Sequence, residues 1–78
     1  MEYVVVEFPD RREVLVDGTP QGYNRELNGE LRILRIDEGG EHRFRLRGPD
    51  DYLPLWLTVD VVGTNVNKPL TVVFTKKV

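Results

Sequence analysis

Val14-Leu15-Val16-Asp17-Gly18-Thr19-Pro20-Gln21-Gly22 is the stretch that decides the fold, together with Gly40-Glu41-His42-Arg43-Phe44-Arg45-Leu46 further along the chain. In the first stretch an apolar run ends at an Asp-Gly pair, which is typical of a tight β-hairpin turn. In the second, a glycine precedes a regular alternation of apolar and charged residues, the pattern of a strand with one buried face. The two stretches predict an antiparallel β architecture and indicate no particular chemistry.

Five segments have the composition of strands, and turn residues separate each from the next. They are Glu2 to Phe8, Glu13 to Asp17, Glu41 to Arg47, Leu55 to Val62, and Leu70 to Lys76. The chain contains no alanine and no serine, so the best helix former and a favoured helix N-cap are both missing. Five strands in so short a chain predict two small sheets packed face to face.

Residues 23–37 leave two alternatives open, a strand or a short helix. Helical spacing is present at Leu27, Leu31 and Leu34, whereas residues 31–36 alternate with one break in register. Because Asn28-Gly29 favours a turn and weakens a helix, we prefer a sixth strand with a bulge from Leu31 to Asp37. The sequence thus predicts an all-β, small antiparallel β-sandwich of about six strands.

Two glycine-containing stretches between these segments are interpreted as turns. Pro20 to Gly22 is expected to close the second strand, and Gly39-Gly40 is expected to form a hairpin turn before the next.

Length and charge limit the class of protein. Seventy-eight residues make a single domain, residues 1–78, with a thin core. The net charge of −2 argues against a nucleic-acid partner, because nucleic-acid-binding domains usually carry a basic excess. Residues 1–39 hold five basic and nine acidic side chains, whereas residues 40–78 hold six and four. This asymmetry indicates two differently charged surfaces or a self-complementary contact.

The lack of cysteine excludes disulfides and thiolate metal sites. No run approaches the roughly 18 apolar residues that span a bilayer, and Met1-Glu2 does not begin a signal peptide. We therefore expect no transmembrane segment and, if the chain is complete as given, a cytoplasmic protein. If it is a piece of a longer surface protein, its place is extracytoplasmic or at the cell surface.

The predicted strand from Glu41 to Arg47 carries a row of arginines. Successive side chains alternate across a strand, so one face presents His42, Phe44 and Leu46 and the other presents Arg43, Arg45 and Arg47. The three guanidinium groups would form a stripe roughly 14 Å long. The stripe is interpreted either as a dock for an acidic partner, a phosphate or a nucleic-acid backbone, or as a solvated face paired with neighbouring acids such as Glu7, Glu13 and Asp60.

Trp56 is the second candidate for binding. Alternation sends Leu55, Leu57, Val59 and Val61 inward, and it sends Trp56 outward with Thr58 and Asp60. An outward tryptophan is a candidate interaction hot spot. The alternative is that its ring packs against the arginine stems of a neighbouring strand, which would shield it without a partner.

Catalytic and metal-binding residues are not expected. His42 is the only histidine, and a turn-edge structural role suits it better than a catalytic one, because the chain has no serine or cysteine nucleophile. The pairs Asp37-Glu38 and Asp50-Asp51 lack the spacing of a calcium loop and are read as turn formers. We therefore expect that the protein is not an enzyme and that it binds neither a metal ion nor a cofactor.

The hairpin Glu13 to Gly22, the turn Gly39-Gly40-Glu41-His42-Arg43-Phe44, and Gly48-Pro49-Asp50-Asp51-Tyr52 together resemble the PEGA domain, a small β-sandwich module of prokaryotic surface and envelope-associated proteins. The resemblance covers about 65 residues and rests on structural motifs. Pro9-Asp10-Arg11-Arg12 replaces the Pro-Glu-Gly-Ala stretch that gives the family its name, and residues 24–33 are longer than the usual connection. The resemblance implies an accessory domain with no catalytic residues.

These observations predict a non-enzymatic protein-interaction or assembly module. It would dock through an exposed strand edge, with Leu70 to Phe74 as the expected edge, or through a surface of Arg43, Arg45, Arg47, Trp56 and Tyr52. Self-association is a second possibility for the same surfaces. The alternative class is a module that binds carbohydrate or an anionic polymer with Tyr23, Tyr52, Trp56 and the arginines.

Overall fold

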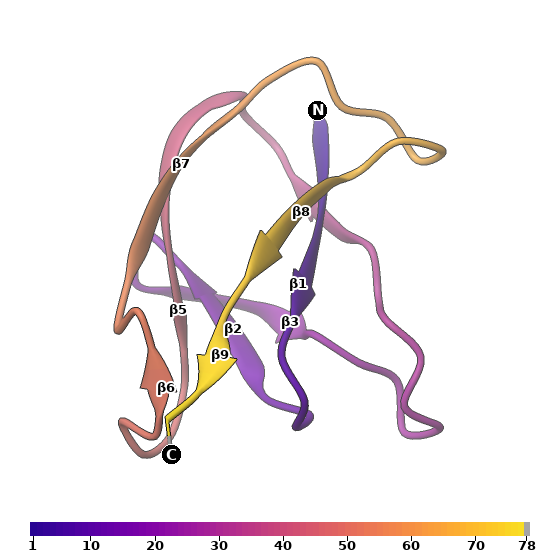
Figure 1. The fold of residues 1–78 in the computed structure, drawn as a ribbon. Coiled ribbons are helices and arrows are strands. Elements are labelled where there is room, and N and C mark those ends of the chain that lie inside the picture. The colour runs from indigo at the N-terminus through magenta and orange to yellow at the C-terminus, as the bar shows by residue number, and fades with distance from the viewer. Residues whose placement is uncertain (78) are drawn as a thin grey trace.

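The computed structural model describes residues 1–77, which form an all-β fold of nine strands and no helix (Figure 1). Among these residues, consequently, no helix is long and apolar enough to cross a membrane. The strands are β1 (Glu2–Glu7), β2 (Glu13–Val16), β3 (Thr19–Tyr23), β4 (Leu34–Ile36), β5 (Gly40–Leu46), β6 (Tyr52–Leu53), β7 (Leu57–Val61), β8 (Leu70–Val73) and β9 (Thr75–Lys76).

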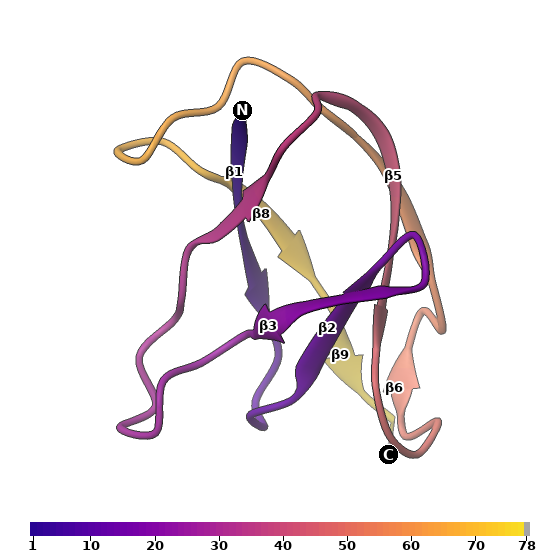
Figure 2. The same ribbon diagram turned by 180° about the vertical axis from the view of Figure 1, so that it is seen from behind.

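The strands form three sheets, and their arrangement can be followed in Figures 1 and 2. One sheet has three strands in the order β4-β1-β8, another has four in the order β3-β2-β5-β7, and the last is the short pair β6-β9. Every pairing is antiparallel except that of β1 with β8. The predicted all-β fold is therefore confirmed, with more and shorter strands than the sequence indicated.

The core lies between the two larger sheets. Alternate residues are buried along β1, β2, β4 and the second half of β5, as the period of a pleated strand requires. The buried apolar side chains are Val4, Val6, Phe8, Val14, Val16, Leu34, Ile36, Phe44, Leu46, Tyr52, Val61, Val72 and Phe74. Both larger sheets contribute to this one cluster, so neither can bury its apolar face without the other.

The predicted hairpin after β2 is present, but the prediction for its second strand, β3, was wrong. Asp17 and Gly18 have φ angles of 52° and 82°, the two positive values that a type I′ turn requires. Residues 20–22, interpreted from sequence as a turn, lie instead within strand β3. Proline is tolerated there because β3 is an edge strand that pairs with β2 alone, and the register shifts between Val14 and Leu15 of β2.

Residues 23–37 contain a strand and no helix. Strand β4 covers only Leu34–Ile36, which is shorter than the predicted strand from residue 31, because β1 pairs with those three residues alone. The preceding loop turns at Asn28-Gly29, where the Gly29 N–H donates to the Glu26 carbonyl over 2.9 Å. Leu27, one of the leucines at helical spacing, is 89% exposed, so the spacing did not mark a buried face.

Gly39-Gly40 forms a corner between sheets, not the expected hairpin turn. Strand β4 belongs to the three-stranded sheet and β5 to the four-stranded one, so the chain crosses the core here. A Cβ atom at Gly39 would lie 3.2 Å from the Val61 carbonyl oxygen, a closer approach than side-chain carbons normally make. Gly39 therefore allows the chain to pass close to the end of β7.

The predicted strand from Leu70 to Lys76 is divided at Phe74 into two strands that pair in different directions. Strand β8 pairs with β1, and β9 pairs with β6. The Phe74 N–H donates to the Glu7 carbonyl, and the Lys77 N–H donates to the Asp51 carbonyl. The C-terminal segment thereby connects the three-stranded sheet to the segment that leads into β7.

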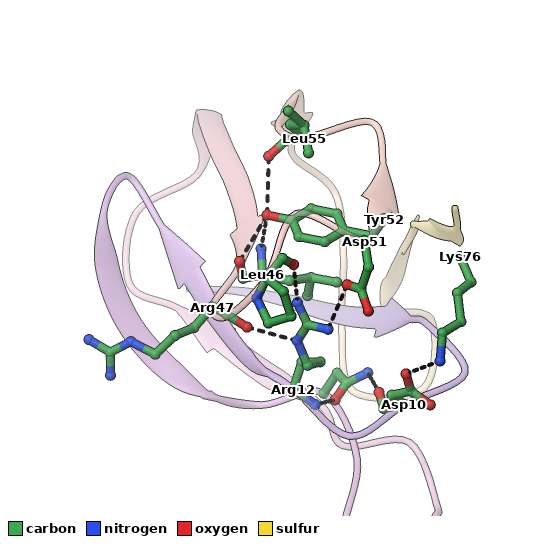
Figure 3. Close-up of polar contacts among 10 residues, drawn as sticks. Asp10, Arg12, Leu46, Arg47, Asp51, Tyr52, Leu55 and Lys76 are labelled. Atoms are coloured by element: carbon green, nitrogen blue, oxygen red, sulfur yellow. Dashed lines mark hydrogen bonds and ion pairs between the residues drawn. The ribbon is translucent and has the colours of Figure 1, made fainter. Parts of the chain in front are cut away.

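Arg12 fixes the connection between β5 and β6 (Figure 3). Its guanidinium donates to the Arg47 carbonyl from Nε over 2.7 Å, to the Pro49 carbonyl from Nη2 over 2.8 Å, and to the Asp51 carboxylate from Nη1 over 2.9 Å. This charge pair holds the pKa of the Asp51 carboxyl below its usual range. Arg12 is only 12% exposed, so it is a structural residue.

Candidate functional site

Arg43 and Arg45 lie on the outer face of β5, as the alternation predicted, and Arg47 is the exposed residue that follows the strand. Phe44 and Leu46 are buried beneath this strand, and Arg43, Arg45 and Arg47 are exposed. Strand β5 occupies an inner position of the four-stranded sheet, between β2 and β7. Arg43 therefore has β7 beside it, opposite Thr58, whereas Arg45 has β2 beside it, opposite Leu15.

Arg47 is already paired within the chain. Its Nη1 lies 2.7 Å from Oε1 of Glu13 on β2, and its backbone N–H donates to the Glu13 carbonyl over 2.9 Å. An exposed pair of this kind contributes about 0–1 kcal/mol to stability. The interpretation of the stripe as a solvated, paired face therefore holds for this arginine.

Arg43 and Trp56 lie against each other. The guanidinium carbon of Arg43 is 5.6 Å from the centroid of the indole ring, within the range of a cation-π contact. Trp56 nevertheless remains 55% exposed. The predicted contact with an arginine is therefore present while more than half of the side chain stays open to solvent, and the role of Trp56 as an interaction hot spot stays a prediction.

Arg45 stands between these two arginines with no acid opposite it. Its cross-strand neighbour on β2 is Leu15. Within residues 1–77, neither Arg43 nor Arg45 forms an ion pair with a carboxylate. Both line an open depression of about 490 Å³, together with Asp17, Gly18, Glu41, His42 and Thr58. We call Arg43, Arg45 and Trp56 the arginine-tryptophan surface.

An apolar shoulder adjoins the arginine-tryptophan surface. It consists of Leu53, Pro54 and Trp56, which with Leu55 line a second open hollow of about 460 Å³. Leu53 and Trp56 are both among the exposed large hydrophobic side chains. A tryptophan beside exposed apolar groups and flanked by arginine has the composition of an interface core.

Tyr52, a predicted binding residue, lies inside the core and is not part of the surface. Its ring makes edge-to-face contacts with Phe8 and Phe74 at centroid distances of 6.1 and 5.5 Å. Its hydroxyl donates to the Leu46 carbonyl over 2.8 Å and accepts the Leu46 N–H over 3.2 Å. As placed, Tyr52 cannot touch a ligand, and it plays the part that a tyrosine corner plays in β-sandwiches.

Tyr23 does not join Trp56 in a common platform. It ends β3, which is at the opposite edge of the four-stranded sheet from β7, the strand that follows Trp56. The guanidinium carbon of Arg11 lies 3.8 Å from the centroid of the Tyr23 ring. The structure therefore separates the aromatic residues that the carbohydrate interpretation combined.

His42 has both ring nitrogens engaged. Nδ1 lies 2.6 Å from Oδ2 of Asp17, and Nε2 lies 2.7 Å from the Glu38 carbonyl oxygen. These bonds raise the pKa of His42, the Asp17 bond contributing most. Across residues 1–77, no three His, Asp or Glu side chains converge in a way that would hold a metal ion.

Sequence reasoning missed Asp17 and Arg12 as organising residues. Asp17 was read only as a turn former, although its carboxylate also accepts the Arg43 N–H over 2.9 Å. Its pKa is lowered, first by this backbone bond and then by His42. An aspartate before glycine at a hairpin tip is a signal for a turn, but nothing in the sequence indicates which distant strand its carboxylate will meet.

Comparison with known proteins adds no relative. A scan against family models found no matching family, and searches of curated proteins and of solved structures found no match.

Proposed function

We propose that this domain is a non-enzymatic protein-interaction module that docks through the arginine-tryptophan surface and the apolar shoulder beside it. The observation that carries the proposal is the 55% exposure of Trp56 against Arg43. Arg43 and its neighbour Arg45 form no ion pair within residues 1–77. Trp56 is not an isolated exposed side chain, because it lines one hollow with exposed Leu53 and Pro54, and a contiguous apolar patch around a tryptophan is typical of a surface that a partner covers.

The chemistry of the surface defines the partner that fits it. Arginine presents a planar fork of donors suited to carboxylates, and the shoulder presents apolar area for a hydrophobic side chain. A protein segment with acidic residues next to an apolar or aromatic residue would satisfy both. The tryptophan would supply most of the affinity, and the arginines would supply orientation and a faster encounter.

The strand edge at β8 is a less favourable docking site. Because the Phe74 N–H bonds toward β1, alternation turns the backbone groups of Thr71 and Val73 to the free side. Beyond Phe74, β9 is already paired with β6. The free edge of β8 is therefore short, and a strand added there would gain few main-chain hydrogen bonds.

Carbohydrate binding is less well supported than protein docking. Sugar platforms use the open face of an aromatic ring, and here Arg43 lies over the Trp56 ring while Tyr23 is at the other edge of the sheet. Membership of the PEGA family stays a prediction. The type I′ hairpin at Asp17-Gly18 and the all-β fold fit it, and an accessory docking role would agree with it.

Affinity capture from source-cell extract tests the proposal with matched variants. The test variants are Trp56→Ala and Arg43→Ser/Arg45→Ser, and the controls are Leu27→Ala, an exposed leucine in a distant loop, and Arg47→Ser, the arginine already paired with Glu13. We expect one defined protein to be captured by the wild type and both controls and lost from both test variants. Its capture should weaken with added salt in the wild type, because exposed charges are screened. Equal capture by the test variants would overturn the proposal.

A further inference from the structure

The side chain of His42 contacts two other segments, the distant tip of the β2–β3 hairpin and the corner that immediately precedes β5. The tip of the β2–β3 hairpin contributes the Asp17 carboxylate, which bonds His42 Nδ1 over 2.6 Å and the Arg43 N–H over 2.9 Å. The corner between β4 and β5 contributes the Glu38 carbonyl, 2.7 Å from His42 Nε2. The imidazole therefore connects the hairpin of the four-stranded sheet to the chain that arrives from the three-stranded sheet.

The hydrogen-bond geometry fixes the charge of the imidazole. An ionised carboxylate and a backbone carbonyl can only accept hydrogen bonds, so both ring nitrogens of His42 must carry a hydrogen to make the two observed contacts. Only the imidazolium form has two N–H groups, because neutral histidine donates from one nitrogen and accepts at the other. In the neutral form, one ring lone pair would face an acceptor.

We propose that His42 is a proton-operated clamp that joins the tip of the β2–β3 hairpin to the corner between the two larger sheets, and that neutralisation of the imidazole releases the corner. The bond to the Asp17 carboxylate persists, because the neutral tautomer that carries its hydrogen on Nδ1 can still donate to this carboxylate. A charged carboxylate is a stronger hydrogen-bond acceptor than the Glu38 carbonyl, so this tautomer is preferred. The bond from Nε2 to the Glu38 carbonyl is then lost.

The charges around the ring favour the closed clamp. The ionisable groups near it are those of Asp17, Asp37, Glu38, Glu41, Arg43 and Arg45. Opposite His42 on β7 is the uncharged Val59. Four carboxyl groups thus outnumber the two guanidinium groups, which agrees with the raised pKa of His42. The clamp does not depend on the proposed docking function, since it is defined by contacts within the chain.

A pH titration of the full chain by NMR tests the clamp. The ring of His42 and the backbone amides of Gly39 and Gly40 are followed in the wild type, in Asp17→Asn and in His42→Gln. Asparagine tolerates the positive φ of residue 17 and keeps an oxygen for the Arg43 N–H, so it removes the charge while preserving the turn.

We expect the Gly39 and Gly40 signals to shift with the same midpoint as the His42 ring in the wild type. The midpoint should move to lower pH in Asp17→Asn, and the glycine signals should be flat over this range in His42→Gln. The proposal is overturned if the glycine signals ignore the His42 midpoint, or if that midpoint is equal in the wild type and Asp17→Asn. Should His42→Gln fail to fold, the comparison of the wild type with Asp17→Asn still decides.

Discussion

Replacing Tyr52 with phenylalanine removes a single oxygen from the core and tests how the end of β5 is held. Pairing of β5 with β7 ends at Phe44 and Leu57, so the Leu46 backbone groups on that side have no strand partner. The Tyr52 hydroxyl takes the place of the missing strand, bonding the Leu46 carbonyl over 2.8 Å and its N–H over 3.2 Å. A third contact, to the Leu55 carbonyl, is 3.3 Å long.

The expected loss of stability follows from the groups left behind. The phenylalanine ring keeps the packing against Phe8 and Phe74, while the buried Leu46 N–H and C=O lose their partner. Each unsatisfied buried group costs about 1–3 kcal/mol, so we expect a loss of about 3 kcal/mol. For a domain of this size that corresponds to a fall in Tm of roughly 12–24 °C, and it is a large part of a total of about 4–12 kcal/mol.

Urea denaturation followed by far-ultraviolet circular dichroism measures the effect, with Tyr23→Phe as the matched control. Tyr23 is partly exposed and its ring lies under Arg11, so removing its hydroxyl should change stability by less than about 0.5 kcal/mol. A loss below about 1 kcal/mol in Tyr52→Phe would refute the reasoning, because it would mean that the Leu46 groups find other partners.

Three further predictions follow from the exposed tryptophan, the hairpin turn and the clamp. Trp56→Ala should change the free energy of unfolding by less than about 1 kcal/mol, because more than half of the side chain is exposed. Thermal denaturation measures this change, and a loss above about 3 kcal/mol would place the ring in the core instead. Gly18→Val should destabilise by about 1–2 kcal/mol or more, because its φ of 82° is strained for a β-branched residue, whereas Gly18→Asn should cost less; equal stability of both variants in urea would contradict the turn assignment. Since the pKa of His42 is raised in the folded state, its stabilising contribution is complete below the unfolded pKa and is lost as pH rises through the folded pKa. The lowered pKa of Asp17 gives the opposite dependence, because its stabilising contribution is present above the unfolded pKa and is lost as pH falls through the folded pKa. Urea midpoints measured from pH 3 to 9 should show both losses of stability in the wild type. His42→Gln should lack the loss at alkaline pH.

Much of the candidate surface could be predicted from the sequence, because it depends on alternation within single strands. The outward direction of Arg43, Arg45 and Trp56 follows from the side-chain period of β5 and of the segment leading into β7. Tyr52 was misplaced because the alternation that holds from Leu55 onward does not extend back to it. The chain bends at Pro54 and Leu55, between β6 and β7, so the period is interrupted before Tyr52 is reached and its ring turns inward.

What the sequence by itself determined was local. The apolar periods of β1, β2, β5 and β7, and the Asp17-Gly18 turn with its two positive φ angles, are fixed by residues close together in the chain. A strand's buried face and a hairpin's turn type depend on backbone geometry over only a few residues.

Only the tertiary structure decided which distant segments meet. The parallel pairing of β1 with β8, the division of the last strand at Phe74, and the contact of Asp17 with His42 join positions far apart in sequence. Such pairings are selected by how the two apolar faces close over one shared core and by which backbone groups would otherwise lack partners. Both are properties of the assembled sheets, and no short stretch of sequence contains them.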